Sequence, residues 1–136
     1  MSKAEHIRIL LQTAGEDGPR GPYRAYFYFF NRQQFYEAHD ILESLWLNER
    51  QGPDNNFYKA LIQLAGAFVH LQKQRVAPAN ALFKLSRSYL MQYPATHQSL
   101  DVGNVLKLID EWLQRLETSP NSLELRDVSL TLSPCA

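Results

Sequence analysis

The chain has 136 residues, of which 45% are hydrophobic and 21% are charged. This length and composition suit one globular domain and exclude disorder of the whole chain. Basic and acidic residues both number 14, so the formal net charge is zero. A neutral chain lacks the positive field that holds a polyanion, which argues against nucleic acid as the main ligand. We expect the basic side chains Lys73, Arg75, Lys84 and Arg87 to form a solvated helix edge.

The only cysteine is Cys135, next to the C-terminus, so no disulfide can form within the chain. This cysteine usage suits a reducing compartment, and the position is a poor one for a catalytic thiol. The first eight residues are too charged for the apolar region of a signal peptide. The apolar runs 25–30 and 64–69 are far too short to span a membrane, so we expect a cytoplasmic protein without a membrane anchor.

The first half of the chain predicts two helices separated by a glycine-rich loop. Residues 3–12 form a short amphipathic pattern, and 15–21 contain three glycines and a proline, which break it. Residues 22–31 carry aromatic side chains around nearly the whole circumference of a helix. Such a helix is buried on several sides or lies in an interface, so it suggests a homo-oligomer or a protein partner. In the alternative, residues 3–12 and the tail 119–136 cover it within one chain.

Two further helices place polar side chains among apolar ones. In a helix over 34–48, His39 and Glu43 lie one turn apart on the apolar face rather than the solvent face. After a break at 49–53, Asp54 is a candidate N-cap for a helix over 55–74. Gln63 and His70 lie two turns apart on its apolar side. We expect these four side chains to be mostly buried, with the two helices facing each other through them.

The second half of the chain predicts two more helices and a tail. Residues 76–78 interrupt the pattern before a helix over 79–91, and a loop follows at 93–96. A long helix over 102–117, capped by Asp101, precedes an extended tail over 119–136. The fold class is therefore all-α: a single-domain helical bundle of about five helices with short loops. The domain spans 1–136, with a core over about 22–117 and an N-terminal helix and loop over 1–21.

Two segments carry a resemblance to a known family. Residues 30–46 and 61–70 resemble the domain of unknown function 309 family, which comprises small all-helical prokaryotic and plastid proteins of uncharacterised role. The family pattern matches this chain at Glu37, His39, Glu43, Trp46, Gln63 and His70. The resemblance covers roughly 22–92 and implies a compact helical bundle with no established activity, so it transfers no catalytic residue. The chain departs from the pattern at Ala60, where glycine is usual, and at 75–79, which replace an Asn-x-x-Gly-Ala turn.

These polar residues allow three interpretations. They form a buried hydrogen-bonded network, in which a histidine offsets the burial of Glu43 and Gln63 bridges what remains. Alternatively, His39, Glu43 and His70 hold a metal, or His39 oriented by Glu43 acts as a general base at a small-ligand site. The sequence has no His-Glu-x-x-His motif and no nucleophile in a recognisable elbow.

The leading hypothesis is a non-enzymatic interaction or small-ligand-binding module with a buried polar cluster. The alternative is a metal-dependent or acid–base enzyme, hydrolase-like, that uses His39, Glu43 and His70. The sequence specifies no cofactor. We expect His6 and His97 to be surface residues in mobile segments.

Overall fold

The computed structural model describes residues 1–121, 123–125 and 128–133. Six helices dominate the described residues: α1 (Lys3–Ala14), α2 (Gly21–Asn31), α3 (Phe35–Asn48), α4 (Asn55–Gln72), α5 (Val76–Leu90) and α6 (Val102–Thr118). A hairpin of two short antiparallel strands, β1 (Thr96–His97) and β2 (Leu100–Asp101), connects α5 to α6. The expected all-α class is confirmed. Cys135 lies outside the described residues.

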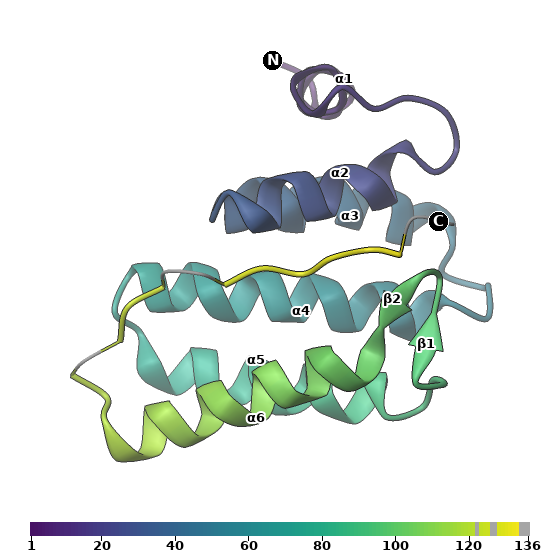
Figure 1. Cartoon of the computed structure of the whole chain (residues 1–136). Coiled ribbons are helices and arrows are strands. Elements are labelled where there is room, and N and C mark those ends of the chain that lie inside the picture. The colour runs from purple at the N-terminus through teal and green to yellow at the C-terminus, as the bar shows by residue number, and fades with distance from the viewer. Residues whose placement is uncertain (122, 126–127, 134–136) are drawn as a thin grey trace.

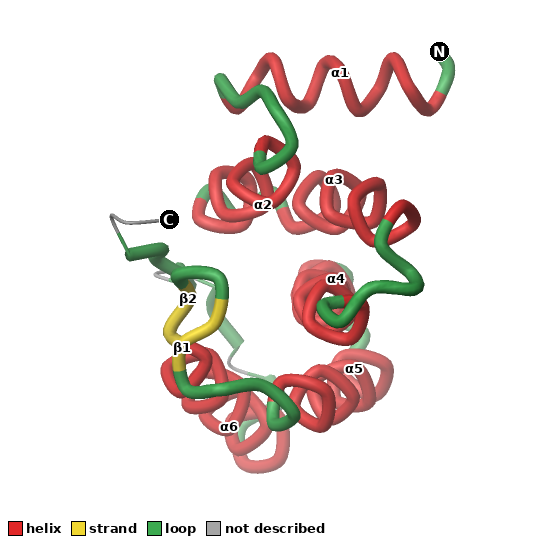
Figure 2. Tube along the Cα trace, turned by 90° about the vertical axis from the view of Figure 1, so that its right-hand side faces the viewer, coloured by secondary structure: helices red, strands yellow, loops and turns green. Residues whose placement is uncertain are grey.

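The helices from α2 to α6 surround one hydrophobic core. Seen end on, α2 and α3 lie side by side, α4 follows, and α5 and α6 close the opposite side (Figure 2). The tail after α6 runs back across the bundle toward α2 (Figure 1). Its Val128 and Leu130 are buried, and the side chain of Asn31 exchanges two hydrogen bonds of 2.7 Å with the backbone of Leu130.

Phe68 of α4 lies at the centre of this core. Its ring is within 6 Å, centroid to centroid, of Phe30 from α2, Phe35 from α3, Phe83 from α5 and Trp112 from α6. Most of these rings meet edge to face, the arrangement that the aromatic quadrupole favours. A single side chain therefore joins five helices.

The aromatic helix α2 is covered within one chain. Tyr23, Tyr26, Phe27, Phe29 and Phe30 are each at most 5% exposed. The helices α1 and α3 pack against α2 within the chain, and the Tyr26 hydroxyl donates a 2.7 Å hydrogen bond to the Leu61 carbonyl on α4. A second subunit is therefore not needed to cover the aromatic side chains of α2. The structure shows the alternative, in which other parts of the same chain cover this helix.

Two expectations about the second half of the chain need correction. The helix expected from residue 79 begins at Val76, because Pro78 falls in its first turn, where no intrahelical N–H bond is lost. The segment expected to be a loop at 93–96 leads into the β1–β2 hairpin. The Asp101 cap is confirmed, since its carboxylate accepts a 3.0 Å hydrogen bond from the Asn104 backbone. In the part of the chain that the structure describes, the helices are too short or too polar to cross a membrane.

Candidate functional site

The predicted polar residues border the contact between α3 and α4. Gly66 on α4 lacks a side chain, and a Cβ placed there would lie 4.0 Å from Cδ2 of His39 and 3.3 Å from Cδ1 of Leu82 on α5. Gly66 therefore lets a histidine from one neighbouring helix and a leucine from the other approach the α4 backbone. We call the surface around this contact the α3–α4 face; it comprises Tyr36, His39, Glu43, Trp46, Gln63, Gly66 and His70.

All four polar side chains are more buried than exposed, as expected, but none of them is fully buried. The side chains of His39 and Glu43 are 32% and 33% exposed. The core-facing side of α3 is formed by Phe35, Ala38, Ile41 and Leu42. With 100° between successive residues, His39 and Glu43 fall at the margin of that side rather than at its centre. Glu37 is also partly buried and makes no hydrogen bond or ion pair with the described residues.

His39 and Glu43 belong to a chain of polar side chains that joins α1 to α3. Lys3 Nζ lies 3.5 Å from Glu43 Oε1, and Glu43 Oε2 lies 4.0 Å from His39 Nε2. On the other side, His39 Nδ1 lies 3.2 Å from Asp40 Oδ1, and His6 Nε2 lies 3.3 Å from Asp40 Oδ2. His6, expected in a mobile segment, instead lies in α1 and ties that helix to α3.

Three buried polar atoms on the α3–α4 face have no hydrogen-bond partner among the described residues. They are Trp46 Nε1, Gln63 Oε1 and His70 Nδ1. The helices α3 and α4 run antiparallel, and His39 lies beside Gly66. Trp46 follows His39 by about two turns, so it lies beside the part of α4 that is two turns before Gly66 and one turn before Gln63. An unpaired buried polar group costs about 1–3 kcal/mol, and native structures contain few of them. The network expected between His39, Glu43, Gln63 and His70 is therefore incomplete.

The same geometry bears on metal binding. Among residues 1–121, 123–125 and 128–133, no three histidine, cysteine, aspartate or glutamate side chains converge closely enough to hold a metal ion. His39 and Glu43 lie near each other, but the carboxylate of Glu43 is also the ion-pair partner of Lys3. As metal ligands, the geometry therefore brings together only His39 and Glu43, and His70 does not join them.

A second polar cluster, absent from the sequence-based expectations, lies at the start of α4. Asp54 Oδ1 is 2.8 Å from His97 Nε2, and Asp54 Oδ2 accepts a 2.6 Å hydrogen bond from the Gln98 amide. The same amide nitrogen is 2.9 Å from the Tyr58 hydroxyl, and Arg20 donates to the Gln98 amide oxygen. Asp54 stands at the expected N-cap position, but its side chain binds the hairpin instead of capping α4.

Burial raises the pKa of Tyr23 and Tyr58, which contact Gln98 of this cluster, and of Tyr26, which lies in the core. The pKa of Tyr23 and of Tyr26 lies well above the usual value of 10.0, because both hydroxyls are buried. The pKa of Tyr58 is raised by burial too, and the hydrogen bond from Gln98 offsets part of that rise. These hydroxyls act as neutral hydrogen-bond groups.

No local feature of the sequence indicates this second cluster. Asp54 and His97 are 43 residues apart, and they meet only because the hairpin folds back over the start of α4. Gln98 and Ser99 adopt positive φ angles of 47° and 62°, which are uncommon for residues other than glycine and form the tight turn of the hairpin. His97, expected at a mobile surface, is three-quarters buried and packs against the rings of Phe57 and Tyr93.

Comparison with known proteins supports the resemblance drawn from the α3 and α4 segments. The chain is 30% identical over 95 residues to the uncharacterized protein YpuF of Bacillus subtilis (strain 168). This match covers 66% of the chain, which spans about half (53%) of that relative's length. The family model described as "domain of unknown function (DUF309)" matches residues 23–82, from α2 into α5. Over this segment the chain is therefore similar to the DUF309 family.

Proposed function

We propose that this chain is a non-enzymatic protein-interaction module whose partner docks on the α3–α4 face. The observation that carries the proposal is the group of three unpaired buried polar atoms, Trp46 Nε1, Gln63 Oε1 and His70 Nδ1. In the free chain these atoms carry a desolvation cost that apolar atoms at the same positions would not have. A partner that supplies their missing hydrogen bonds would explain why polar atoms are present there.

The chemistry of these atoms favours a polypeptide as the partner. The indole N–H of Trp46 needs an acceptor, and the Gln63 carbonyl oxygen needs a donor. A peptide backbone carries both groups at every residue except proline. Tyr36, whose ring stacks on His39 and is 58% exposed, adds an aromatic contact of the kind enriched at protein interfaces. Because the three atoms are shielded from solvent in the free chain, docking requires small side-chain rotations.

The enzyme alternative has less support from the geometry. Its candidate residues His39, Glu43 and His70 do not converge on one point, as the absence of a three-ligand group among the described residues indicates. Glu43 is instead the ion-pair partner of Lys3 on α1, and Asp40 lies 3.3 Å from Nε2 of His6 on the same helix.

A stability measurement separates a binding role from a structural one. Methionine has the shape of glutamine without its polar atoms, so Gln63→Met removes the unpaired oxygen. We expect the free chain to keep its stability or gain about 1 kcal/mol, because a desolvated and unpaired group disappears. Gln12→Met, at an exposed position on α1, is the matched control. A loss of stability in Gln63→Met that the control does not share would show that Gln63 serves the fold.

Site-specific photo-crosslinking in cells tests the docking itself. A benzophenone amino acid at position 36 should give one discrete crosslinked protein, whereas the same residue at Lys107, exposed on α6, should not. Introducing Gln63→Met should reduce the crosslink from position 36. Equal crosslinking from both positions, or a crosslink that Gln63→Met leaves unchanged, would contradict the proposal.

A further inference from the structure

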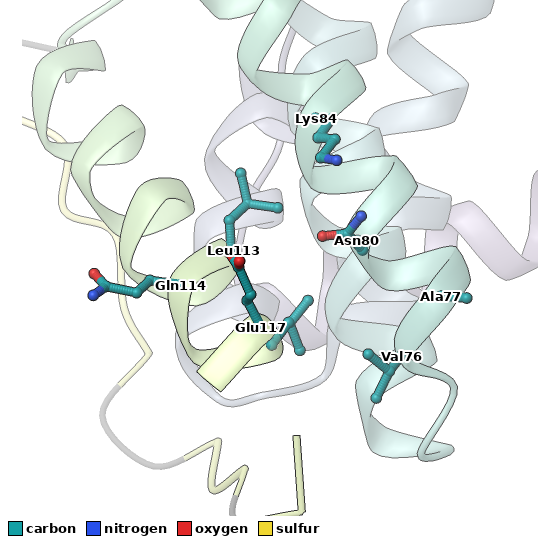
Figure 3. Close-up of a pocket in the computed structure, with 8 residues that line it drawn as sticks. Val76, Ala77, Asn80, Lys84, Leu113, Gln114 and Glu117 are labelled. Atoms are coloured by element: carbon teal, nitrogen blue, oxygen red, sulfur yellow. The ribbon is translucent and has the colours of Figure 1, made fainter. Parts of the chain in front are cut away.

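A second surface, separate from the α3–α4 face, is a groove between α5 and α6. The groove has a volume of about 740 Å³, and its lining includes Val76, Asn80, Leu113 and Leu116 (Figure 3). The two helices run antiparallel, since Val76 and Leu116 line one end and Arg87 pairs with Asp110 beyond the other. Apolar side chains thus line a hollow between two helices that are tied together by an ion pair outside it.

Two charged side chains of opposite sign border this groove. Lys84 projects from α5 and Glu117 from α6, and both are exposed. Neither forms an ion pair with any residue of the described ranges. Asp110, the acidic residue on the adjacent part of α6, is bound to Arg87 at 2.9 Å instead. The antiparallel order places Lys84 toward one end of the groove and Glu117 toward the other.

We propose that a second copy of this chain docks on the α5–α6 groove through a twofold axis. The axis lies in the plane of this surface, at right angles to the line from Lys84 to Glu117. Rotation about it places Lys84 of each copy opposite Glu117 of the other copy. Such a contact is isologous, so the one arrangement forms two ion pairs. Asn80 and Leu113 lie between the charges, and an asparagine amide can pair with its own symmetry mate because it both donates and accepts.

Charge complementarity is the reason for choosing a second copy over another occupant. The groove presents one positive and one negative group at its opposite ends, with Asn80 and Leu113 between them, so its charge pattern is complementary to that of a second copy. A strongly acidic or strongly basic partner would meet repulsion at one of the two ends. This surface does not overlap the α3–α4 face, so the dimer and the proposed docking of a partner can be tested separately.

Charge reversal provides a test that a folding defect cannot imitate. Sedimentation velocity over a range of concentrations should show a dimer of twice the 15.7 kDa chain mass. Lys84→Glu and Glu117→Lys should each weaken dimerisation about tenfold or more, because both ion pairs become repulsive. An equimolar mixture of the two variants should restore the dimer as a heterodimer, since each contact then joins opposite charges. Lys107→Glu and Glu111→Lys, on another side of α6, are the matched controls and should leave the dimer unchanged.

Several outcomes would overturn the proposal. A chain that stays monomeric at all concentrations has no such dimer, and a protein or peptide found in the groove instead would identify another occupant. A dimer that survives both single reversals uses a different surface. Variants that fail to recombine, while keeping the helical circular dichroism of the unmodified chain, would show that Lys84 and Glu117 do not meet across the interface.

Discussion

Asp54 and His97 are joined at 2.8 Å between Oδ1 and Nε2, across 43 residues of chain. The other carboxylate oxygen of Asp54 accepts from Gln98, so one side chain holds the end of β1 and the first residue of the hairpin turn against the start of α4. Both partners are about three-quarters buried, at 28% and 25% side-chain exposure. The contact therefore fixes where the chain turns from α5 into α6.

Removing this carboxylate should loosen the hairpin. We expect Asp54→Ala to destabilise the chain by about 1–3 kcal/mol, because His97 and Gln98 lose their acceptor in a partly buried site. Asp54→Asn keeps one oxygen and should cost less. Urea unfolding gives both values, and amide hydrogen exchange at 96–101 should quicken in the alanine variant. An unfolding midpoint equal to that of the unmodified chain would mean that the cluster adds no stability.

Glu43 should contribute little to stability, because it is one-third exposed and its closest partner, Lys3, lies 3.5 Å away with a 64% exposed side chain. Exposed ion pairs typically contribute about 0–1 kcal/mol. We therefore expect Glu43→Ala to cost less than about 1 kcal/mol. A double-mutant cycle with Lys3→Ala measures the pair directly. A cost of several kcal/mol would instead support the buried hydrogen-bonded network that the sequence analysis considered for Glu43.

Phe68→Ala should be among the most destabilising substitutions in the chain. The ring is fully buried and contacts rings from four other helices, so its removal leaves a cavity at the centre of the core. Such substitutions cost about 3–5 kcal/mol. The control is Tyr36→Ala, an aromatic residue that is 58% exposed and should cost little. Denaturant midpoints of both variants check the contrast, and equal losses would contradict the central position of Phe68.

Alkaline pH should destabilise the chain through its buried tyrosines. Burial raises the pKa of Tyr23 and Tyr26 in the folded state above the usual 10.0. Below pH 10 both states keep the proton and the stability is intact. Above it, the unfolded chain ionises first, so stability falls as the pH rises toward the folded pKa. Urea midpoints measured from pH 8 upward, with tyrosinate absorbance recording ionisation, check this expectation.

A variant isolates one of these hydroxyls. Tyr26→Phe removes the hydroxyl that donates to the Leu61 carbonyl, so its stability should fall less steeply with pH above 10. Tyr36→Phe, at an exposed position, should leave that slope unchanged. Identical slopes in all three proteins would mean that ionisation of Tyr26 does not drive the alkaline loss.

The sequence by itself determined the helical architecture. Apolar residues recur with the helical period, and the breaks at 15–21 and 49–53 contain the glycines and prolines that end helices, so α1 to α4 were predicted closely. The α3 and α4 segments also carry the residues on which the resemblance to the DUF309 family rests, and the family model matches residues 23–82. These features are local, and each depends on residues a few positions apart.

Only the tertiary structure decided how buried each polar side chain is and which groups it meets. The helical period placed His39 and Glu43 on the apolar side of α3. How much of that side is buried depends on how α1 and α4 pack against α3, and in the structure His39 and Glu43 lie at the margin of the buried part. The pairing of Asp54 with His97 depends on a hairpin with positive φ angles at Gln98 and Ser99. Neither residue type indicates such a turn in the sequence. The covering of the aromatic helix α2 likewise depends on contacts between segments far apart along the chain, such as Asn31 with Leu130.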